Sequence, residues 1–334
     1  MSMRFTAAAL LSVLTGCAIA ASPTAVAAPA SAASAAVFDR TTGHRVDVGG
    51  VKVFYREAGP PTAPTVLLLH GNPSSSFMFR DLIPRLAARF HVIAPDYPGY
   101  GYSDTPAPQS YRYTFDHLAQ TIDLLLTRIG VTEYVLYMQD YGGPVGMRLA
   151  TAHPERVKGL VIQNANAYME GLPTQWSTEL ERQIDAAAAH PTAPATFKHK
   201  PPSAFEDNLK WTRGMYVTGA RDPESMTPDG YTFDAAMLSR AGQDDIQDVL
   251  GDDYYTNVLL YPTWQKWLRQ YQPRTLIVWG RGDRIFGPVG AEAYKRDLPQ
   301  AKLVFYDGGH FMLEEYAAQV AQDIIAVFSP AAAS

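Results

Sequence analysis

From Val46 onward, short runs rich in β-branched and aromatic residues alternate with longer stretches that have helical spacing. This alternation is typical of a mostly parallel sheet with helices on both faces, because parallel strands are joined by crossovers that are usually helical. The expected strands are 46–48, 51–56, 65–69, 91–94, 134–138, 159–163, 275–279 and 302–306. The clearest helix is 115–129, which has apolar residues at helical spacing and stops before Gly130. The fold class predicted is therefore α/β.

The stretch 168–262 interrupts this alternation, because it is rich in aromatic residues and contains no obvious strand of the main sheet. We interpret it as a mainly helical cap inserted between two strands. Open α/β sheets place their sites beyond the carboxyl ends of the strands, so such an insertion is expected to cover the site. The expected organisation is a core of 37–167 and 263–330, a helical cap of 168–262, and a leader of 1–36.

The composition fits a globular protein with one catalytic domain. The chain has 334 residues, of which 47% are hydrophobic, and its formal net charge is −5. Lys and Arg (28) are outnumbered by Asp and Glu (33), and no basic run is present. A nucleic-acid partner is therefore not expected, because such partners require a positively charged surface.

The N-terminus has the features of an export signal. Arg4 precedes the apolar stretch 5–14, and an Ala-rich segment without charges follows up to Asp39. The apolar stretch is too short to span a bilayer as a mature helix. We therefore expect a periplasmic or secreted protein.

Two kinds of processing fit this leader. Leu14-Thr15-Gly16-Cys17 resembles a bacterial lipobox, which would place a lipid anchor on Cys17, whereas the small residues at 18–20 or 28–30 suit ordinary signal cleavage. Both alternatives remain open. Because Cys17 is the only cysteine, the mature chain has neither an intramolecular disulfide nor a cysteine nucleophile.

Asp140 has the sequence context of a nucleophile. It follows the apolar run 134–138, and a Gly-bearing turn and a helical stretch come after it. A strand, a tight turn and a helix form a nucleophile elbow, which exposes the central side chain at the helix N-terminus, where an anion is stabilised. The alternative is that Asp140 is an ordinary helix N-cap.

Two further residues occupy the positions of a catalytic triad. Asp283 directly follows the predicted strand 275–279, and His310 directly follows the predicted strand 302–306. The order of nucleophile, acid and histidine, each beyond the carboxyl end of a strand, is that of an α/β-hydrolase triad. A lone histidine is usually structural, but three matching positions in order favour a catalytic role for His310.

A fourth element follows the strand 65–69, in His70-Gly71-Asn72-Pro73. The glycine permits a turn close to the site, and the backbone N–H groups of Asn72 and Tyr141 are expected to form an oxyanion hole. The alternative is a simple chain reversal.

Taken together, residues 46–328 resemble the α/β-hydrolase superfamily, and within it the haloalkane dehalogenase and epoxide hydrolase group. The similar segments are 70–76, 94–104, 139–143, 279–283 and 309–311. The resemblance implies the fold, Asp140 as nucleophile, and a His–Asp pair that activates water. Met138 departs from the small residue that is usual two positions before the nucleophile.

A carboxylate is poorly suited to ester or amide hydrolysis but is a competent nucleophile at sp3 carbon, where it forms an alkyl ester. We therefore expect Asp140 to open an epoxide to a diol or, alternatively, to displace a halide from a small haloalkane, and His310 with Asp283 to drive hydrolysis of the ester. A serine-type esterase is disfavoured because position 140 is Asp. A non-catalytic hydrolase-like binding protein is a further alternative.

No metal or cofactor is expected, because no metal cluster or phosphate-binding glycine loop is evident.

The choice between epoxide and halide depends on groups that contact the leaving atom. Segment 253–257 is similar to the epoxide hydrolase segment that contains a proton-donating tyrosine, which maps onto Tyr255, with Tyr254 beside it. A second donor, Tyr216 or Tyr231, is a weaker match. Tyr141 stands where dehalogenases carry a halide-binding Trp, whereas Asn72 fits their turn, and Trp211 is a candidate halide donor. Lid or core packing is the alternative role for Tyr254, Tyr255 and Trp211.

Overall fold

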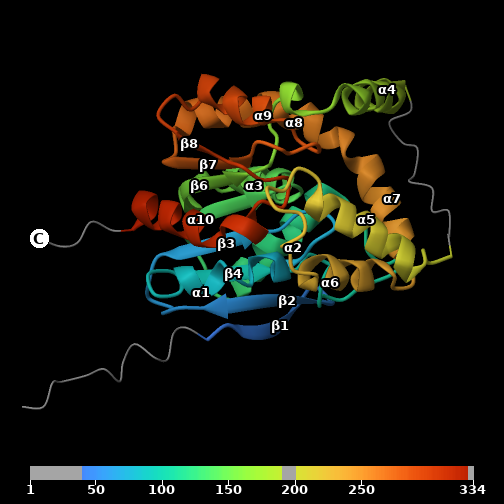
Figure 1. Cartoon of the computed structure of the whole chain (residues 1–334), viewed down its shortest axis with the longest axis horizontal. Coiled ribbons are helices and arrows are strands. Elements are labelled where there is room, and N and C mark those ends of the chain that lie inside the picture. Colours follow the sequence, from blue (N-terminus) through green and yellow to red (C-terminus); the bar gives the residue numbers. More distant parts are fainter. Residues whose placement is uncertain (1–39, 190–200, 330–334) are drawn as a thin grey trace, which may run out of the picture. The chain divides into compact units, whose positions relative to one another are not determined.

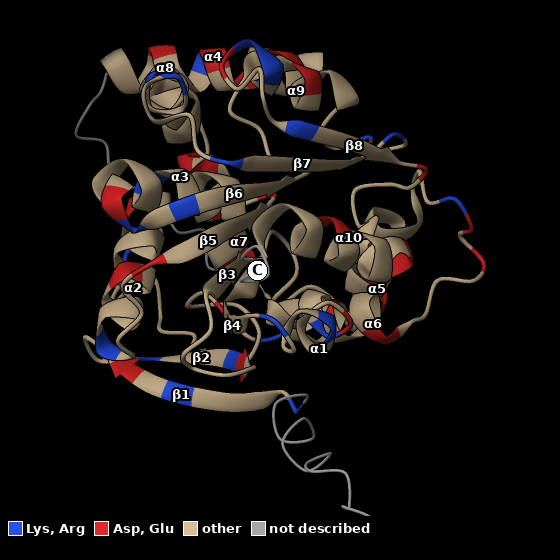
Figure 2. Cartoon of the chain, turned by 90° about the vertical axis from the view of Figure 1, so that its left-hand side faces the viewer, with Lys and Arg blue, Asp and Glu red and all other residues tan. Residues whose placement is uncertain are grey.

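A single eight-stranded sheet organises the described part of the chain, which comprises residues 40–189 and 201–329 of a computed structural model. The strand order is β1-β2-β4-β3-β5-β6-β7-β8 (Figures 1 and 2). β1 and β2 pair with each other, and β2 with β4, in antiparallel fashion, whereas all other pairs are parallel. The expected mostly parallel α/β sheet is thereby confirmed.

The strands are β1 (Thr42–Val48), β2 (Val51–Ala58), β3 (Thr65–Leu69), β4 (His91–Pro95), β5 (Tyr134–Gln139), β6 (Val157–Gln163), β7 (Thr275–Gly280) and β8 (Lys302–Tyr306). The α-helices are α1 (Ile83–Leu86), α2 (Phe115–Arg128), α3 (Gly142–Ala152), α4 (Thr174–Ala189), α5 (Phe205–Val217), α6 (Asp229–Leu238), α7 (Gln243–Asp253), α8 (Tyr255–Tyr271), α9 (Pro288–Ala293) and α10 (Leu313–Phe328).

Helices cover both faces of the sheet (Figure 2): α1 and α10 pack on one face, and α2 and α3 on the other. Alternate residues of each strand enter the two buried clusters. In β5, Leu136 and Met138 join the cluster that contains α2 and α3, whereas Val135 and Tyr137 join the cluster that contains α1 and α10. Both faces of the strand are therefore buried, which explains why parallel strands appear in the sequence as continuous apolar runs.

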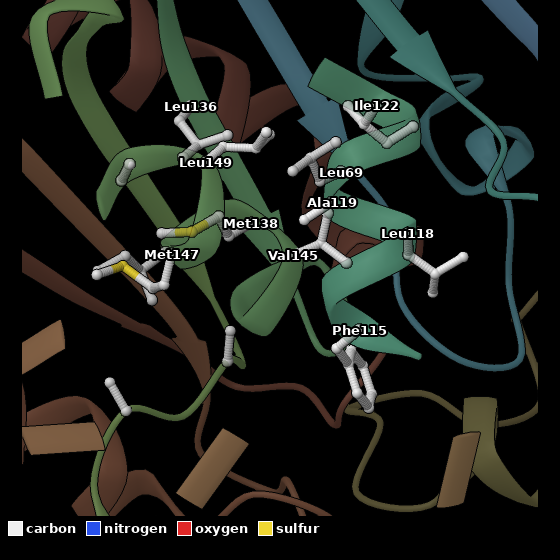
Figure 3. Packing of buried hydrophobic residues seen from close by; sticks show 14 of the residues in the cluster. Leu69, Phe115, Leu118, Ala119, Ile122, Leu136, Met138, Val145, Met147 and Leu149 are labelled. Carbon is white, nitrogen blue, oxygen red and sulfur yellow. The ribbon is translucent and has the colours of Figure 1, made fainter. Parts of the chain in front are cut away.

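Helix α2 shows how the local sequence sets the ends of an element. The Thr114 side chain accepts a hydrogen bond from the His117 backbone N–H at the N-terminus, and Gly130 follows the helix with a φ of 74°. The apolar side chains predicted to share one face are buried against the sheet and α3 (Figure 3). The helix therefore holds α3, which follows Asp140, against the sheet.

Among the described residues, five α-helices, α4 to α8, lie between β6 and β7. The last of them continues to Tyr271, beyond the expected boundary at 262, and contains Pro262. A proline removes one hydrogen bond and kinks a helix without necessarily ending it. Part of the proline- and lysine-containing stretch of this insertion, 190–200, lies outside the described residues.

The expectations for the leader, including those for Cys17, concern residues outside the described part. Within 40–189 and 201–329, no helix combines the length and apolar character needed to cross a bilayer. Acidic and basic residues alternate over the helices and outer strands (Figure 2).

Met138 is completely buried, and a glycine on α3 provides the space for it. A Cβ built on Gly146 would lie 2.6 Å from the Met138 sulfur and 2.7 Å from its Cγ. Figure 3 shows Met138 on β5 in the group that also holds Val145 and Met147 of α3. The large side chain of Met138 is thus accommodated because Gly146, on the facing helix, has no side chain.

We predict that Gly146→Ala lowers the free energy of unfolding by about 1–3 kcal/mol, because the added methyl overpacks the Met138 contact. Urea unfolding measures this effect, and Gly214→Ala in α5 is the control, because its Cβ would meet no atom within 4 Å. In the Gly146→Ala background, Met138→Ala should cost less than it does in the wild type. Equal costs in both backgrounds would contradict this packing account.

Candidate active site

Three side chains meet beyond the carboxyl ends of β5, β7 and β8. His310 Nδ1 lies 2.9 Å from Asp283 Oδ2, and His310 Nε2 lies 3.6 Å from Asp140 Oδ2. All three residues are buried, with exposed fractions of 6% for Asp140, 4% for Asp283 and 1% for His310. The structure thus brings together the nucleophile, acid and histidine that the sequence order indicated.

Asp140 adopts a φ of 47° between β5 and α3, in the left-handed region that non-glycine residues seldom occupy. Such a conformation costs about 1–3 kcal/mol and persists only where the surroundings hold it. The turn after β3 supplies one such support, because the Asn72 backbone N–H donates to Asp140 Oδ1 over 2.7 Å. A Cβ on Gly71 would lie 2.2 Å from the Asp140 Cβ, so the two turns approach as closely as glycine permits.

The Asp140 carboxylate does not cap α3. The N-cap of that helix is Tyr141, whose side chain makes no capping hydrogen bond. Within the turn, the Gly143 N–H donates to the backbone carbonyl of Asp140 and not to its side chain. The carboxylate instead accepts from Asn72 and faces His310. It is therefore positioned to react rather than to terminate a helix.

Asp283 is fixed by hydrogen bonds to both of its oxygens. Oδ1 accepts from the backbone N–H groups of Ile285 and Phe286 at 2.7 and 3.0 Å, and Oδ2 accepts from the Asn164 side-chain amide at 2.6 Å. Asn164 directly follows β6 and has a φ of 44°. Sequence reasoning missed Asn164; the available signal was an Asn, a residue that tolerates the left-handed region, at the same edge of the sheet.

The surroundings of His310 favour its charged form. Burial lowers the pKa of His310. The charges of Asp283 and Asp140, together with the hydrogen bonds that both carboxylates make to the imidazole, outweigh the effect of burial and raise the pKa to about 10. The imidazolium is thus held between two carboxylates in the resting site. Loss of either negative charge removes part of that stabilisation.

The backbone around Asp140 offers donors for an oxyanion. The Asn72 N–H already binds Oδ1, and the Tyr141 N–H lies at the N-terminus of α3, where backbone N–H groups have no partner within the helix. The Tyr100 hydroxyl donates to the Asn72 side-chain oxygen over 3.2 Å and holds this turn. A charge that develops on Oδ1 would therefore meet prearranged donors.

A cavity of about 440 Å³ opens above Asp140. It is lined by Asn72, Asp140, Tyr141, Trp176, Glu179, Leu180, Gln183, Trp211, Met215, Gly251, Tyr254, Ile285 and Phe286. A second cavity of about 400 Å³ reaches His310 and shares Trp211, Met215 and Ile285 with the first. The site therefore combines one buried carboxylate with a mainly apolar, aromatic binding space.

The structure separates the residues considered as leaving-group donors. Tyr254 and Trp211 line the cavity above Asp140, whereas Tyr255 is absent from its lining and packs against the main buried cluster. Neither Tyr216 nor Tyr231 lines the cavity. The Tyr216 hydroxyl donates a hydrogen bond to Asp234 over 2.6 Å, and the Tyr216 ring stacks on Phe311.

Tyr141, which the sequence placed at the position of a halide-binding Trp, lies beside Tyr254, a pairing that sequence reasoning did not anticipate. Its ring lies 6.0 Å from that of Tyr254, and both rings line the cavity above Asp140. Burial and the Asp140 charge raise the pKa of both phenols, so both keep their protons at neutral pH. Two tyrosines that keep their protons therefore line the cavity that contains the Asp140 carboxylate.

In the part of the chain that the structure describes, no three His, Cys, Asp or Glu side chains are grouped so that they could hold a metal ion.

We predict that Asp140→Asn lowers the pKa of His310 from about 10, because the substitution removes one of the two anions that stabilise the imidazolium. In the wild type, the pKa of His310 in the native state lies above its value of about 6.5 in the unfolded state, so protonation of His310 stabilises the native state. This stabilisation is fully present below about pH 6.5. The contribution is lost as the pH rises through 10. Titration of the imidazole nitrogens by NMR measures the shift.

Asp116→Asn is the control for this titration, because it removes a carboxylate from α2 without a contact to His310. An Asp140→Asn protein whose His310 titrates as in the wild type would contradict the proposed coupling.

Comparisons with known proteins agree with this geometry. Residues 64–317 match the model of the alpha/beta hydrolase fold family. An uncharacterized hydrolase of Saccharomyces cerevisiae is 44% identical over 287 residues, which is 86% of this chain and 97% of the yeast protein. Haloalkane dehalogenase 2 of Mycobacterium tuberculosis is 27% identical over 303 residues, covering 83% of this chain and 91% of that protein.

Among solved structures, the epoxide hydrolase CorEH superposes with a TM-score of 0.65 at 20% identity, covering 86% of this chain and 99% of that chain. At this identity the likeness concerns the fold. The family match and the yeast relative together show that the chain belongs to the α/β-hydrolase fold family and is a hydrolase, with haloalkane dehalogenases among its more distant relatives.

Proposed function

We propose that Asp140 attacks an sp3 carbon of an epoxide and forms an alkyl ester, which His310 and water then hydrolyse to a diol. The observation that carries this proposal is the placement of the Asp140 carboxylate: Oδ1 is bound by the Asn72 N–H, while Oδ2 faces His310 beneath an aromatic cavity. A carboxylate displaces leaving groups at sp3 carbon efficiently, whereas its attack on a carbonyl yields an anhydride that reverts.

In the first step, Asp140 Oδ2 forms a bond to one epoxide carbon as the carbon–oxygen bond of the ring breaks. The developing alkoxide requires a proton, and we assign its donation to Tyr254 or Tyr141, which both line the cavity. Because burial raises the pKa of each phenol, each retains its proton until the ring opens. The products of the step are the hydroxyalkyl ester and a tyrosinate.

Esterification also prepares His310 for the second step. The ester is neutral, so one of the two anions that raise the pKa of His310 disappears and the imidazolium can release its proton to solvent. Neutral His310, with Nδ1–H directed to Asp283, then takes a proton from water. The hydroxide adds to the Asp140 Cγ, and the oxyanion forms on Oδ1 beside the Asn72 and Tyr141 N–H groups.

Collapse of this intermediate breaks the bond between Cγ and the ester oxygen. The diol leaves with that oxygen and takes the proton from His310, and the proton of the new carboxyl group restores the tyrosine. His310, again between two carboxylates, regains from solvent the proton that it released after esterification. The enzyme returns to its resting state, with one water molecule consumed for each epoxide.

Displacement of halide from a haloalkane is the second candidate function, and a contact of Asn72 favours it. The Asn72 side-chain oxygen accepts from Tyr100, and Asn72 and Trp211, which each carry a side-chain N–H group, both line the cavity. Two N–H donors would suit a halide. The closely spaced phenols of Tyr141 and Tyr254 favour the epoxide.

The covalent step is tested by trapping the ester. His310→Gln, incubated with styrene oxide or 1-bromobutane, should accumulate an enzyme whose mass is increased by the alkyl group, because esterification proceeds without the base. Asp140→Asn is the control and should form no adduct. Absence of an adduct on Asp140, with a compound that the wild type converts, would rule out the covalent mechanism.

The proton donor is tested by two adjacent substitutions. We predict that Tyr254→Phe lowers epoxide turnover by about 100-fold, because it removes a phenol beside the reacting oxygen. Turnover of 1-bromobutane should change little, since a halide leaves without a proton. Tyr255→Phe is the matched control, and a larger loss in that variant would assign the donor to position 255.

A further inference from the structure

The amide of Gln139 lies at the centre of the site and has no role in the mechanism above. Gln139 is the last residue of β5, directly before Asp140, and is completely buried. Its Nε2 lies 3.1 Å from His310 Nε2, the nitrogen that must accept a proton from water. Its Oε1 has no hydrogen-bond partner in the described structure. A buried acceptor without a partner is costly and requires an explanation.

The position of Oε1 indicates what it could contact. A Cβ built on Gly71 would lie 2.5 Å from Gln139 Oε1 and 2.6 Å from Asp140 Oδ1, so both oxygens flank the same turn. His310 Nε2 faces the other carboxylate oxygen over 3.6 Å. The amide, the imidazole and the carboxylate thus lie together beside the turn at Gly71.

We infer that Gln139 is a positioning residue that orients the hydrolytic water against the Asp140 ester, an inference that rests on the proposed covalent function. The water oxygen forms its bond to Cγ while one water proton moves to His310 Nε2. The second O–H donates to Gln139 Oε1, which fixes the direction of the lone pair that attacks. No proton is transferred to the amide.

An amide suits both states of His310. When His310 is charged, its Nε2–H is a donor, which Oε1 can accept after rotation about the terminal carbon–carbon bond; when His310 is neutral, Nε2 accepts from one O–H of the water and Oε1 accepts from the other. The Gln139 amide can therefore pair with the imidazole in the resting enzyme and accept from the water after esterification. A thioether of similar size can do neither.

Gln139→Met tests the inference through the two half-reactions. With styrene oxide or 1-bromobutane, whichever the wild type converts, rapid-quench mass spectrometry should show ester formation within about twofold of the wild-type rate. Hydrolysis of the ester should slow about tenfold or more, so that the adduct accumulates. The matched control is Gln163→Met: Gln163 pairs with Gln139 in the sheet register and is equally buried, but its side chain accepts from the Tyr137 hydroxyl.

Gln139→Glu provides a second readout that a purely structural role would not produce. The carboxylate keeps an acceptor for water but adds a negative charge beside His310, which should raise the pKa of the imidazolium in the ester state. The acid limb of ester hydrolysis should therefore move to higher pH, while ester formation persists. This variant also tests the inference if Gln139→Met fails to fold.

Three outcomes would overturn the assignment: ester hydrolysis in Gln139→Met at the wild-type rate, equal slowing of both half-reactions in Gln139→Met and Gln163→Met, or an unmoved pH limb in Gln139→Glu. Failure of the underlying function is distinguishable, because His310→Gln would then give no ester at all. An ester that accumulates in His310→Gln but not in Gln139→Met contradicts only the role of Gln139.

Discussion

The close approach of two turns fixes the geometry on which the site depends. Asp140 is held at a φ of 47°, where its carboxylate can meet the Asn72 N–H only because Gly71 has no side chain. The burial of both faces of β5 and the packing of α3 against the sheet hold this strained turn in place. The sheet therefore keeps the Asp140 backbone in an unfavourable conformation, and this conformation places the Asp140 carboxylate within reach of the His310 imidazole.

The second constraint is electrostatic. One imidazolium lies between two carboxylates, and backbone N–H groups and Asn164 donate hydrogen bonds to both oxygens of Asp283. In the proposed mechanism, esterification removes the charge of Asp140, so the first chemical step itself changes His310 from a cation into a base. The same three residues would thus perform two steps in a fixed order.

Much of the architecture was predictable from the sequence because burial on both faces leaves continuous apolar runs in parallel strands. Asp140, Asp283 and His310 could be named because each directly follows such a run. Asn164 and Gln139 were missed, since their roles depend on which loops meet across the sheet and not on local pattern. The mapping of a donor onto Tyr255 illustrates a related difficulty: α8 begins at that residue, and neighbouring positions of a helix point about 100° apart, so only the three-dimensional structure shows that Tyr254 lines the cavity.

The path of the water oxygen tests the covalent account most directly. In a single turnover with enzyme in excess over substrate in H₂¹⁸O, the account predicts that the label enters the Asp140 carboxylate, because hydroxide attacks Cγ and the product leaves with an original carboxylate oxygen. The peptide containing Asp140 should gain the mass of one ¹⁸O, and the product of this first turnover should contain none. Label in the product with an unlabelled Asp140 would show that water attacks the substrate directly and would contradict the account.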